Sequence, residues 1–438
     1  MKKSCFFLFA AFLALSGCSD SADDNEVLDK DEPPVEFNGS QIFYTTIDDS
    51  KLSPNSSDFA VFGSNLLSNT YEDGQGVWTF EGTVSRIGEN AFKECGCLES
   101  IVIPDVVVEI GEDAFEGCVN LKEVSLGNGV TNIGQGAFSY CTSLSEIVLP
   151  DALASIGDFA FLQCRSLQHA SLGSGVTHIG FGAFSDCLNL SDIILPDGLT
   201  VIGSLAFSRC MNLTNIAIPD GIAEMGVGVF IECQNLTAFE GKFASADGRC
   251  IVMDGVLKSF APHELSAYTV PDGVAVIGSG VFFNCSLLES VVLPEDVTVI
   301  EESAFLDCMR LSSISLPAGV TSIGNFAFSG CSNLTSITIP DGVTEINHHA
   351  FSDCMRLSSI TLPVGVTSIG ASAFISCPKL VELYCKPTNP PAVDLTAFDI
   401  FVGVPTSLQV YVPTASVDVY KAAYPWSELA GQIMGYDF

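Results

Sequence analysis

The sequence is poor in positive charge, in histidine and in catalytic motifs. Lys and Arg total 17 against 52 Asp and Glu, so the formal net charge is −35 over 438 residues. Because nucleic acids are held mainly through their phosphates by basic side chains, this balance argues against a nucleic-acid partner. The five histidines form no H-E-x-x-H motif, and neither a Walker loop nor a G-x-S-x-G elbow occurs. We therefore predict no enzyme, and no catalytic, metal-binding or cofactor-binding residues.

Long apolar runs are missing after the N-terminal segment, so we expect lipid to be the only membrane attachment. Residues 1–17 have the order of a signal peptide: two lysines, an apolar run and then small residues. The LSGC that ends at Cys18 resembles a bacterial lipobox. This resemblance implies cleavage before Cys18 and lipid attachment to its sulfur; the alternative is an ordinary signal with a chance cysteine.

The segment that follows the lipobox is strongly acidic. Residues 18–36 carry eight Asp and Glu, one Lys and little apolar content. Such a segment buries too little to fold, so we predict an extended, self-repelling tether. The acidic cluster also resembles the export signals of surface lipoproteins in the Bacteroidetes. That resemblance implies an outer-membrane location facing the cell exterior.

A 23-residue repeat dominates the rest of the chain. Its consensus is I-G-x-x-A-F-x-x-C-x-x-L-x-x-I-x-L-P-x-x-V. The repeat aromatics, spaced 23 residues apart within each of two blocks, are Phe92, Phe115, Phe138, Phe161, Phe184, Phe207 and Phe230, then Phe282, Phe305, Phe328, Phe351 and Phe374. The L-x-x-I-x-L part has the alternation of a strand that Pro ends, whereas I-G-x-x-A-F-x-x-C has the spacing of a short helical turn. We predict one strand and one helical turn per repeat.

A single repeat cannot fold alone. Five or so inward side chains stabilise the fold by about 1.5 to 3 kcal/mol each. Their sum falls well short of the conformational entropy cost of ordering 23 residues, which is roughly 1 to 2 kcal/mol for each residue. Stacking repeats about 4.8 Å apart pairs the strands and makes one continuous core. The predicted fold is therefore an α/β repeat solenoid of the leucine-rich-repeat type, with about 14 coils and one strand per coil.

The A-F-x-x-C and L-x-x-I-x-L-P patterns also resemble the BspA-like leucine-rich-repeat surface proteins of gut and oral bacteria. The resemblance covers roughly residues 75–433. It implies adhesion to host proteins or to other cells. The chain departs from the common leucine-rich repeat in having no Asn ladder, because Pro or Gly follows its strand.

Breaks in the period suggest a division of the chain. The step from Phe230 to Phe282 is 52 residues, and Asp247-Gly248 and Asp254-Gly255 within it read as hairpin turns. The predicted parts are an N-terminal cap at 37–80, a first repeat arm at 81–238, an irregular coil with a β-hairpin insertion at 239–271, a second repeat arm at 272–406, and a C-terminal strand and helical cap at 407–438.

Twelve cysteines recur at one phase of the repeat: Cys95, Cys118, Cys141, Cys164, Cys187, Cys210, Cys233, Cys285, Cys308, Cys331, Cys354 and Cys377. They come singly, whereas structural zinc sites use closely spaced pairs. Stacked side chains that point the same way hold their Cβ atoms about 4.8 Å apart, beyond the usual disulfide range of about 3.5 to 4.5 Å. We therefore interpret them as buried packing residues. Pairing of Cys97, Cys250 or Cys385, which lie off this ladder, stays open.

Candidate binding residues are those that face outward beside the strand isoleucine. One row in the first arm comprises Glu123, Glu146, His169, Asp192 and Asn215, beside a partly apolar row that includes Val148 and Ile194. A second candidate is the basic set Lys242, Arg249 and Lys258 in the insertion. The alternatives are a solvated sheet face and basic residues that balance nearby carboxylates.

Together these features predict an exported, lipid-anchored surface protein that binds an extracellular protein or glycan through the sheet face of its solenoid. We expect a monomer. The competing hypothesis is a structural or spacer surface protein without a specific ligand. An enzyme is the third possibility, and no motif supports it.

Overall fold

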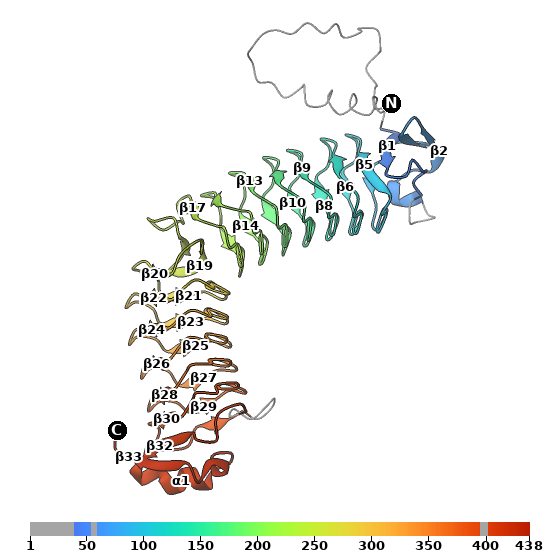
Figure 1. Ribbon diagram of the computed structural model, residues 1–438. Coiled ribbons are helices and arrows are strands. Elements are labelled where there is room, and N and C mark those ends of the chain that lie inside the picture. Colours follow the sequence, from blue (N-terminus) through green and yellow to red (C-terminus); the bar gives the residue numbers. More distant parts are fainter. Residues whose placement is uncertain (1–38, 54–58, 395–401) are drawn as a thin grey trace.

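The computed structural model describes residues 39–53, 59–394 and 402–438. It is a parallel β-solenoid of about 15 turns, which confirms the predicted leucine-rich-repeat-like solenoid. Figure 1 shows the coils stacked in two arms that meet at an angle near β17 and β20, with the N-terminal cap at one end and α1 at the other. The predicted Cys18 and its tether lie outside the described residues.

The first strand ladder is built from the L-x-x-I-x-L part of each repeat. Its strands pair in parallel within each of several short sheets, and within a sheet the isoleucine-phase residues stand opposite one another, as Ala170 does between Ile147 and Ile193. The strands are β5 (Leu98–Val102), β7 (Glu123–Ser125), β9 (Glu146–Val148), β11 (His169–Ser171), β13 (Asp192–Ile194), β15 (Asn215–Ala217), β17 (Ala238–Glu240), β20 (Ala267–Thr269), β22 (Ser290–Val292), β24 (Ser313–Ser315), β26 (Ser336–Thr338), β28 (Ser359–Leu362), β30 (Glu382–Cys385), β32 (Gln409–Pro413) and β33 (Ile433–Tyr436).

A second ladder consists of two-residue strands, most of which end at the isoleucine of I-G. It comprises β4 (Arg86–Ile87), β6 (Glu109–Ile110), β8 (Asn132–Ile133), β10 (Ser155–Ile156), β12 (His178–Ile179), β14 (Val201–Ile202) and β16 (Glu224–Met225) in the first arm. In the second arm it comprises β21 (Val276–Ile277), β23 (Val299–Ile300), β25 (Ser322–Ile323), β27 (Glu345–Ile346), β29 (Ser368–Ile369) and β31 (Ala392–Val393). The prediction of one strand per coil was therefore wrong, and the described part of the chain has little helix.

The expected helical turn after I-G is a series of turns instead. Two residues in this part of a coil take a positive φ, for example Phe159 at 56° and Gln163 at 57°, and such residues cannot continue an α-helix. The backbone also bonds between coils here: the Phe115 N–H donates to the Ala137 carbonyl at 2.7 Å. Pairing with the next coil thus replaces the bonds within a helix.

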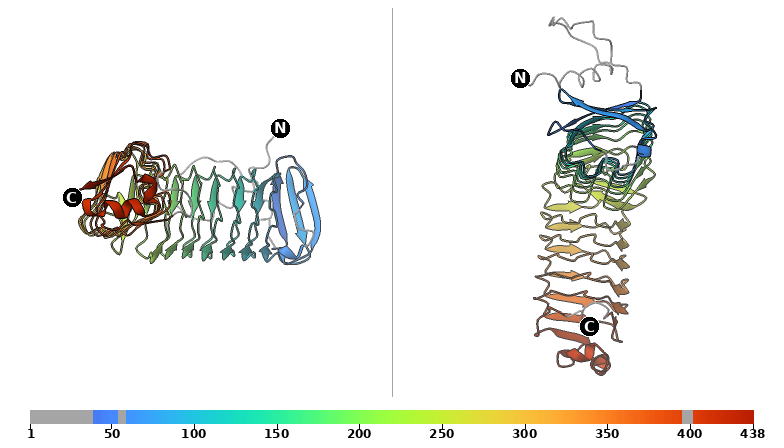
Figure 2. Two further views of the ribbon diagram at one scale, coloured as in Figure 1. Left: turned by 90° about the horizontal axis from the view of Figure 1, so that it is seen from below. Right: turned by 90° about the vertical axis from the view of Figure 1, so that its right-hand side faces the viewer.

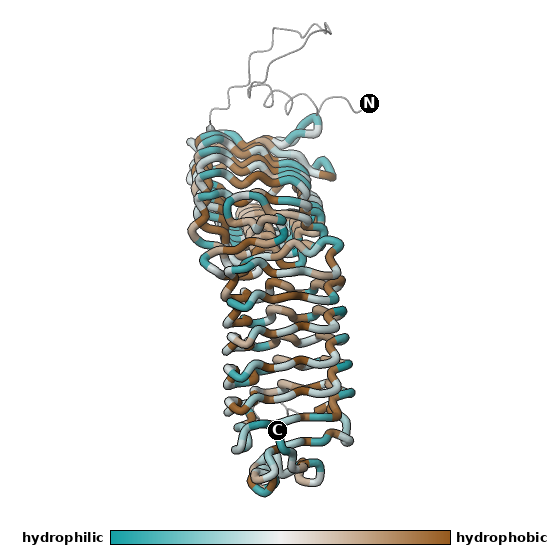
Figure 3. The backbone as a smooth tube through the Cα atoms, turned by 90° about the vertical axis from the view of Figure 1, so that its left-hand side faces the viewer, coloured by the Kyte–Doolittle hydropathy of each residue, from teal (hydrophilic) through white to brown (hydrophobic). Residues whose placement is uncertain are grey.

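Aromatic rings form a column through each arm. Phe115 and Phe138 lie 5.0 Å apart between ring centroids with planes 3° apart, and Phe305 and Phe328 lie 5.2 Å apart at 4°. Coils that repeat in register place identical side chains one above another, so the rings stack face to face. Figure 3 shows the same regularity, because apolar segments of successive coils in the second arm lie one above another.

The cysteine ladder lies inside this core. The 15 cysteines of the described residues are free thiols, and every one of the ladder is buried. The Cys141 thiol donates to the Phe115 carbonyl of the preceding coil at 3.2 Å, and the Cys331 thiol donates to the Phe305 carbonyl at the same distance. The Phe115 carbonyl also accepts the Cys118 N–H at 3.1 Å, so the Cys141 thiol donates to the second lone pair of this carbonyl oxygen. Cysteine thus fits this position as a small apolar group that is also a weak donor.

Both ladders break between β16 and β21. A hairpin of β18 (Cys250–Met253) and β19 (Val256–Phe260) turns at Asp254-Gly255, where both residues have positive φ. Strand β19 then pairs in parallel with β21, so the hairpin starts the second ladder of the next arm. The buried side chains form one cluster on each side of this break.

Non-repeat elements close the two ends. At the N-terminus, β1 (Gln41–Thr46), η2 (Phe59–Phe62), β2 (Leu66–Glu72) and β3 (Gln75–Phe80) place Trp78 on Phe92, with ring centroids 5.3 Å apart. At the other end are η3 (Thr414–Ser416), α1 (Val417–Ala422) and η4 (Trp426–Leu429). The Trp426 indole donates to the Pro391 carbonyl at 3.0 Å. In the left view of Figure 2 the second arm is seen nearly end on, with α1 across its end.

Candidate functional site

The five predicted residues of the first-arm row are brought together by strand register. His169 stands opposite Glu146 on one side and Asp192 on the other, and Glu123 and Asn215 extend the row through β7 and β15. All five side chains are exposed. His169 Nδ1 lies 3.6 Å from an Asp192 carboxylate oxygen, so a protonated His169 would pair with it. The row holds three carboxylates, one imidazole between the second and the third, and an amide at its end.

An apolar row runs beside this acidic one. Val148 is 65% exposed and Ile194 is 76% exposed, with Ser171 between them in register. The residues between the two rows, such as Ile147, point into the core. We call the surface formed by Glu123, Glu146, His169, Asp192 and Asn215 together with Val148, Ser171 and Ile194 the first-arm face.

The backbone of the first-arm face is already committed to pairing. Strand β11 bonds to β9 on one side and to β13 on the other. A ligand cannot add itself as a further strand at β11, because the N–H and C=O groups of that strand are paired on both sides. At β11 the face therefore offers side chains only, and the groups of the whole face are carboxylates, one imidazole, one amide, one hydroxyl and branched apolar side chains.

The three basic candidates of the insertion are not gathered in the same way. The Lys242 ammonium contacts the Asp220 carbonyl and lies 4.6 Å from the Phe243 ring centroid. The Arg249 guanidinium donates to the carbonyls of Ala261 at 3.4 Å and His263 at 3.3 Å. Lys258 lines a small pocket elsewhere on the hairpin. Lys242 and Arg249 each hold backbone in place, and this gives both a structural role.

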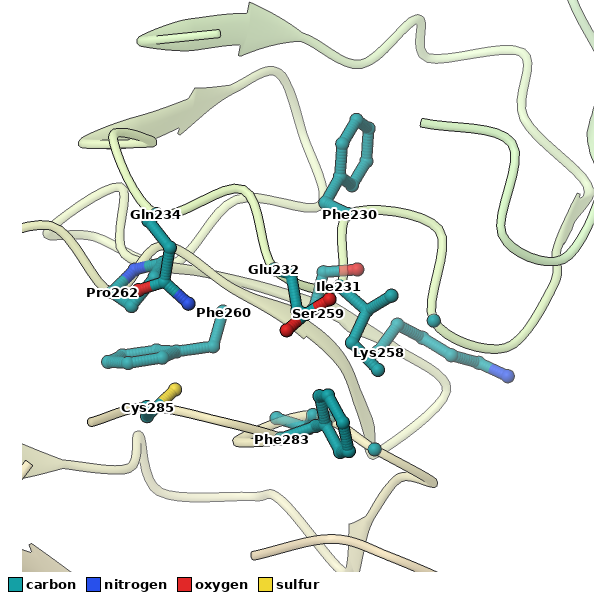
Figure 4. A pocket seen from close by; sticks show the side chains of 13 residues that line it. Phe230, Ile231, Glu232, Gln234, Lys258, Ser259, Phe260, Pro262, Phe283 and Cys285 are labelled. Carbon is teal, nitrogen blue, oxygen red and sulfur yellow. The ribbon is translucent and has the colours of Figure 1, made fainter. Parts of the chain in front are cut away.

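The arm junction has two hollows that sequence reasoning did not identify. The smaller holds about 10 Å³, roughly one water molecule. Figure 4 shows Glu232, Ser259 and Phe260 close together there, while Lys258 directs its ammonium away from them. The Ser259 hydroxyl is buried, and no group among the described residues is its hydrogen-bond partner. The signal that could have located these hollows is the 52-residue step between Phe230 and Phe282.

The larger hollow is an open cleft of about 520 Å³ between the last coil of the first arm and the first coil of the second. Its lining includes His263, Glu264, Leu265 and Leu287. Beside it the Asn284 amide donates to a Glu232 carboxylate oxygen at 2.7 Å, and the Gln234 amide donates to the Asn284 carbonyl at 3.2 Å. These bonds tie the two arms together across the break.

The buried thiols of the core stay protonated at neutral pH. Burial raises the pKa of Cys164, Cys233 and Cys308 from 9.0 to about 12, so none is a thiolate at neutral pH. Among the described residues, no group of three or more His, Cys, Asp or Glu side chains is placed to hold a metal ion. In the same part of the chain, every helix is too short or too polar to cross a membrane.

The comparisons with known proteins agree with this geometry. A family model for the BspA type leucine rich repeat region matches residues 77–185, 154–243 and 257–381. A leucine rich cell surface protein from Faecalibacterium prausnitzii is 27% identical, with a TM-score of 0.54 over 81% of this chain and 95% of that one. No curated protein matches.

Two further solved structures share the fold. The pneumococcal vaccine antigen PcpA is 22% identical, with a TM-score of 0.60 over 84% of this chain and 88% of that one. A leucine-rich repeat protein from Eubacterium ventriosum is 19% identical, with a TM-score of 0.58 over 85% of this chain and 98% of that one.

Proposed function

Because the chain belongs to the BspA-type leucine-rich-repeat family, we propose that it is a surface-displayed binding protein whose first-arm face holds an extended extracellular protein or glycan. The observation that carries the proposal is the register of that face. Each coil presents the same two outward positions, so a ligand that lies along the solenoid meets a new pair about every 4.8 Å.

The chemistry of the face restricts its ligand. Glu123, Glu146 and Asp192 favour a partner that presents positive or hydrogen-bond-donating groups, since like charges placed opposite each other repel. The exposed side chains of Val148 and Ile194 add apolar area beside these carboxylates. The similar cell surface protein of Faecalibacterium prausnitzii supports a surface location.

We further propose that Cys18 carries the lipid anchor and that residues 19–36 space the solenoid from the outer membrane. In the expressing bacterium, Cys18→Ala should move the protein from the membrane fraction to the soluble fraction. Membrane association that Cys18→Ala leaves unchanged would reject the anchor. We expect the anchored protein to act as a monomer, and light scattering of residues 19–438 would test that.

The binding experiment uses residues 19–438 immobilised and probed with extracellular-matrix proteins and a glycan array. Glu123→Lys combined with Glu146→Lys should abolish retention of the ligand. The matched control is Glu109→Lys combined with Glu224→Lys, which makes the same charge change at exposed strand positions of the second ladder in the same arm. Loss of binding in the first variant alone supports the proposal.

Two outcomes would reject the first-arm face. Equal retention by both variants would show that the ligand binds elsewhere on the molecule. If the unaltered protein retained no probe, the spacer hypothesis would be favoured instead.

A further inference from the structure

A cluster of aromatic rings lies at the far end of the second arm. Tyr384 on β30 stacks on Tyr411 of β32, with ring centroids 4.7 Å apart and planes 15° apart. Tyr436 of β33 stands edge-on to both, at 5.5 Å from Tyr384 and 5.7 Å from Tyr411. Phe438 adds a fourth ring 5.0 Å from Tyr436. We call these four residues the aromatic platform.

The aromatic platform lies outside the hydrophobic core. In β30 the inward residues are Leu383 and Cys385, so Tyr384 faces outward. Tyr436 is 44% exposed and Phe438 is 50% exposed. The open end of the core is closed by other aromatic residues, namely Tyr420 and Trp426, which are buried. Closing the solenoid therefore does not require the platform, and its exposed ring area is unexplained by folding.

Polar groups border the rings. Glu382 and Gln409 stand opposite each other in the row next to Tyr384 and Tyr411, which places a carboxylate and an amide beside the stacked pair. Both side chains are partly exposed. Rings flanked by planar hydrogen-bonding groups suit a ligand that has both C–H faces and hydroxyl edges.

An uncharged track leads to the platform along the same face. In register order its residues are Ser313 and Ser315 on β24, Ser336 and Thr338 on β26, and Ser359 and Thr361 on β28. The next coil carries Glu382 and Tyr384, where the platform begins. The hydroxyls of Ser313, Ser336 and Thr338 are exposed, and within the described residues no protein group bonds to them. They are free to bond a ligand that supplies many hydroxyls. Figure 3 faces this side of the second arm, and the C-terminus lies in front.

We propose that the uncharged track and the aromatic platform together bind a neutral polysaccharide. The polysaccharide lies along the track and stacks its sugar rings on the platform. The coil spacing of about 4.8 Å is close to the length of one hexose in an extended chain, so successive coils can meet successive sugars. Stacking supplies apolar contact with the C–H faces, and the hydroxyls, Glu382 and Gln409 bond the sugar edges.

The charge of the molecule selects a neutral glycan. The formal net charge is −35, and the two rows of the track contain no basic residue. A sulfated or carboxylated glycan would be repelled by this field and would find no cation to pair with. This surface is separate from the first-arm face, so the proposal stands or falls independently of the function proposed above.

The test measures binding of residues 19–438 to soluble neutral β-glucan and mannan by calorimetry and affinity electrophoresis, with dextran sulfate as the anionic probe. The variant combines Tyr436→Ala with Tyr384→Thr, because Thr is the residue that β26 and β28 carry in this register. The matched control is Tyr424→Ala, which removes a 69% exposed tyrosine from the C-terminal cap outside the platform.

We expect the variant to weaken binding of a neutral polysaccharide at least tenfold, while Tyr424→Ala and the double variant of the first-arm face bind as the unaltered protein does. Unchanged Trp426 fluorescence would verify that the cap remains folded. The proposal is overturned if neither neutral polysaccharide binds, if the variant binds as tightly as the control, or if dextran sulfate is preferred.

Discussion

Raising the pH above 9 should unfold this solenoid through its buried thiols. Burial raises the pKa of Cys164, Cys233, Cys308 and Cys377 from the ordinary value of 9.0 to about 12. In the unfolded chain the same thiols ionise near pH 9. The stabilising effect is complete below pH 9 and is lost as the pH rises toward 12, because only the unfolded state can then release these protons.

The magnitude follows from the shift. Each thiol that stays protonated in the folded state lowers the free energy of unfolding by about 1.4 kcal/mol for every pH unit above its pKa in the unfolded chain. At pH 10 the four thiols together should remove about 6 kcal/mol, which is comparable to the whole stability of many domains, about 5 to 15 kcal/mol. The other ladder thiols are shifted in the same direction, so alkaline unfolding should be steep.

Urea denaturation followed by circular dichroism, with reductant present, would measure the free energy of unfolding between pH 7.5 and 10.5. Lysine and tyrosine side chains titrate in the same range, so the informative quantity is a difference between two proteins. Cys308→Ala should reduce the slope of unfolding free energy against pH by about 1.4 kcal/mol per unit, while also lowering stability at pH 7.5. Identical slopes for Cys308→Ala and the unaltered protein would refute the reasoning.

The other predictions concern close packing and thiol accessibility. A Cβ added at Gly203 would lie 2.6 Å from the Gly180 carbonyl carbon and 2.7 Å from the Phe181 nitrogen. These are backbone atoms that cannot rotate away, so Gly203→Ala should cost about 3 kcal/mol in urea denaturation. Gly198→Ala, where the nearest atom is 3.6 Å away, should change little, and equal midpoints for the two variants would contradict the packing argument. Maleimide labelling of native residues 19–438 should modify Cys97 first, because it is the half-buried thiol among the described residues. Denaturation should make the remaining thiols accessible to maleimide. If most cysteines stayed unlabelled because they are disulfide-bonded, the interpretation of the ladder as free packing residues would be wrong.

The periodic part of the candidate site followed from sequence because the repeat supplies its own register. Once residues 23 apart are equivalent, alternation places Ile147 inside and both Glu146 and Val148 outside, and the structure has this arrangement. The positions of Lys242, Arg249 and Lys258 could not be obtained this way, because no neighbouring repeat specifies the path of an insertion. Their contacts with Asp220, Ala261 and the small pocket arise from how the hairpin folds back.

The solenoid, the inward rows and the burial of the cysteine ladder follow from the sequence alone, because a strict period with apolar residues at constant phase can bury its core only by stacking. The backbone path between those rows depends on contacts between coils. Bonds to the next coil, such as that from Phe115 to Ala137, turned the expected helix into turns with a second short strand. Tertiary structure also assembled the aromatic platform, since Tyr411 follows Tyr384 by 27 residues and so falls outside the period. Only strand pairing across coils of unequal length brings these rings together.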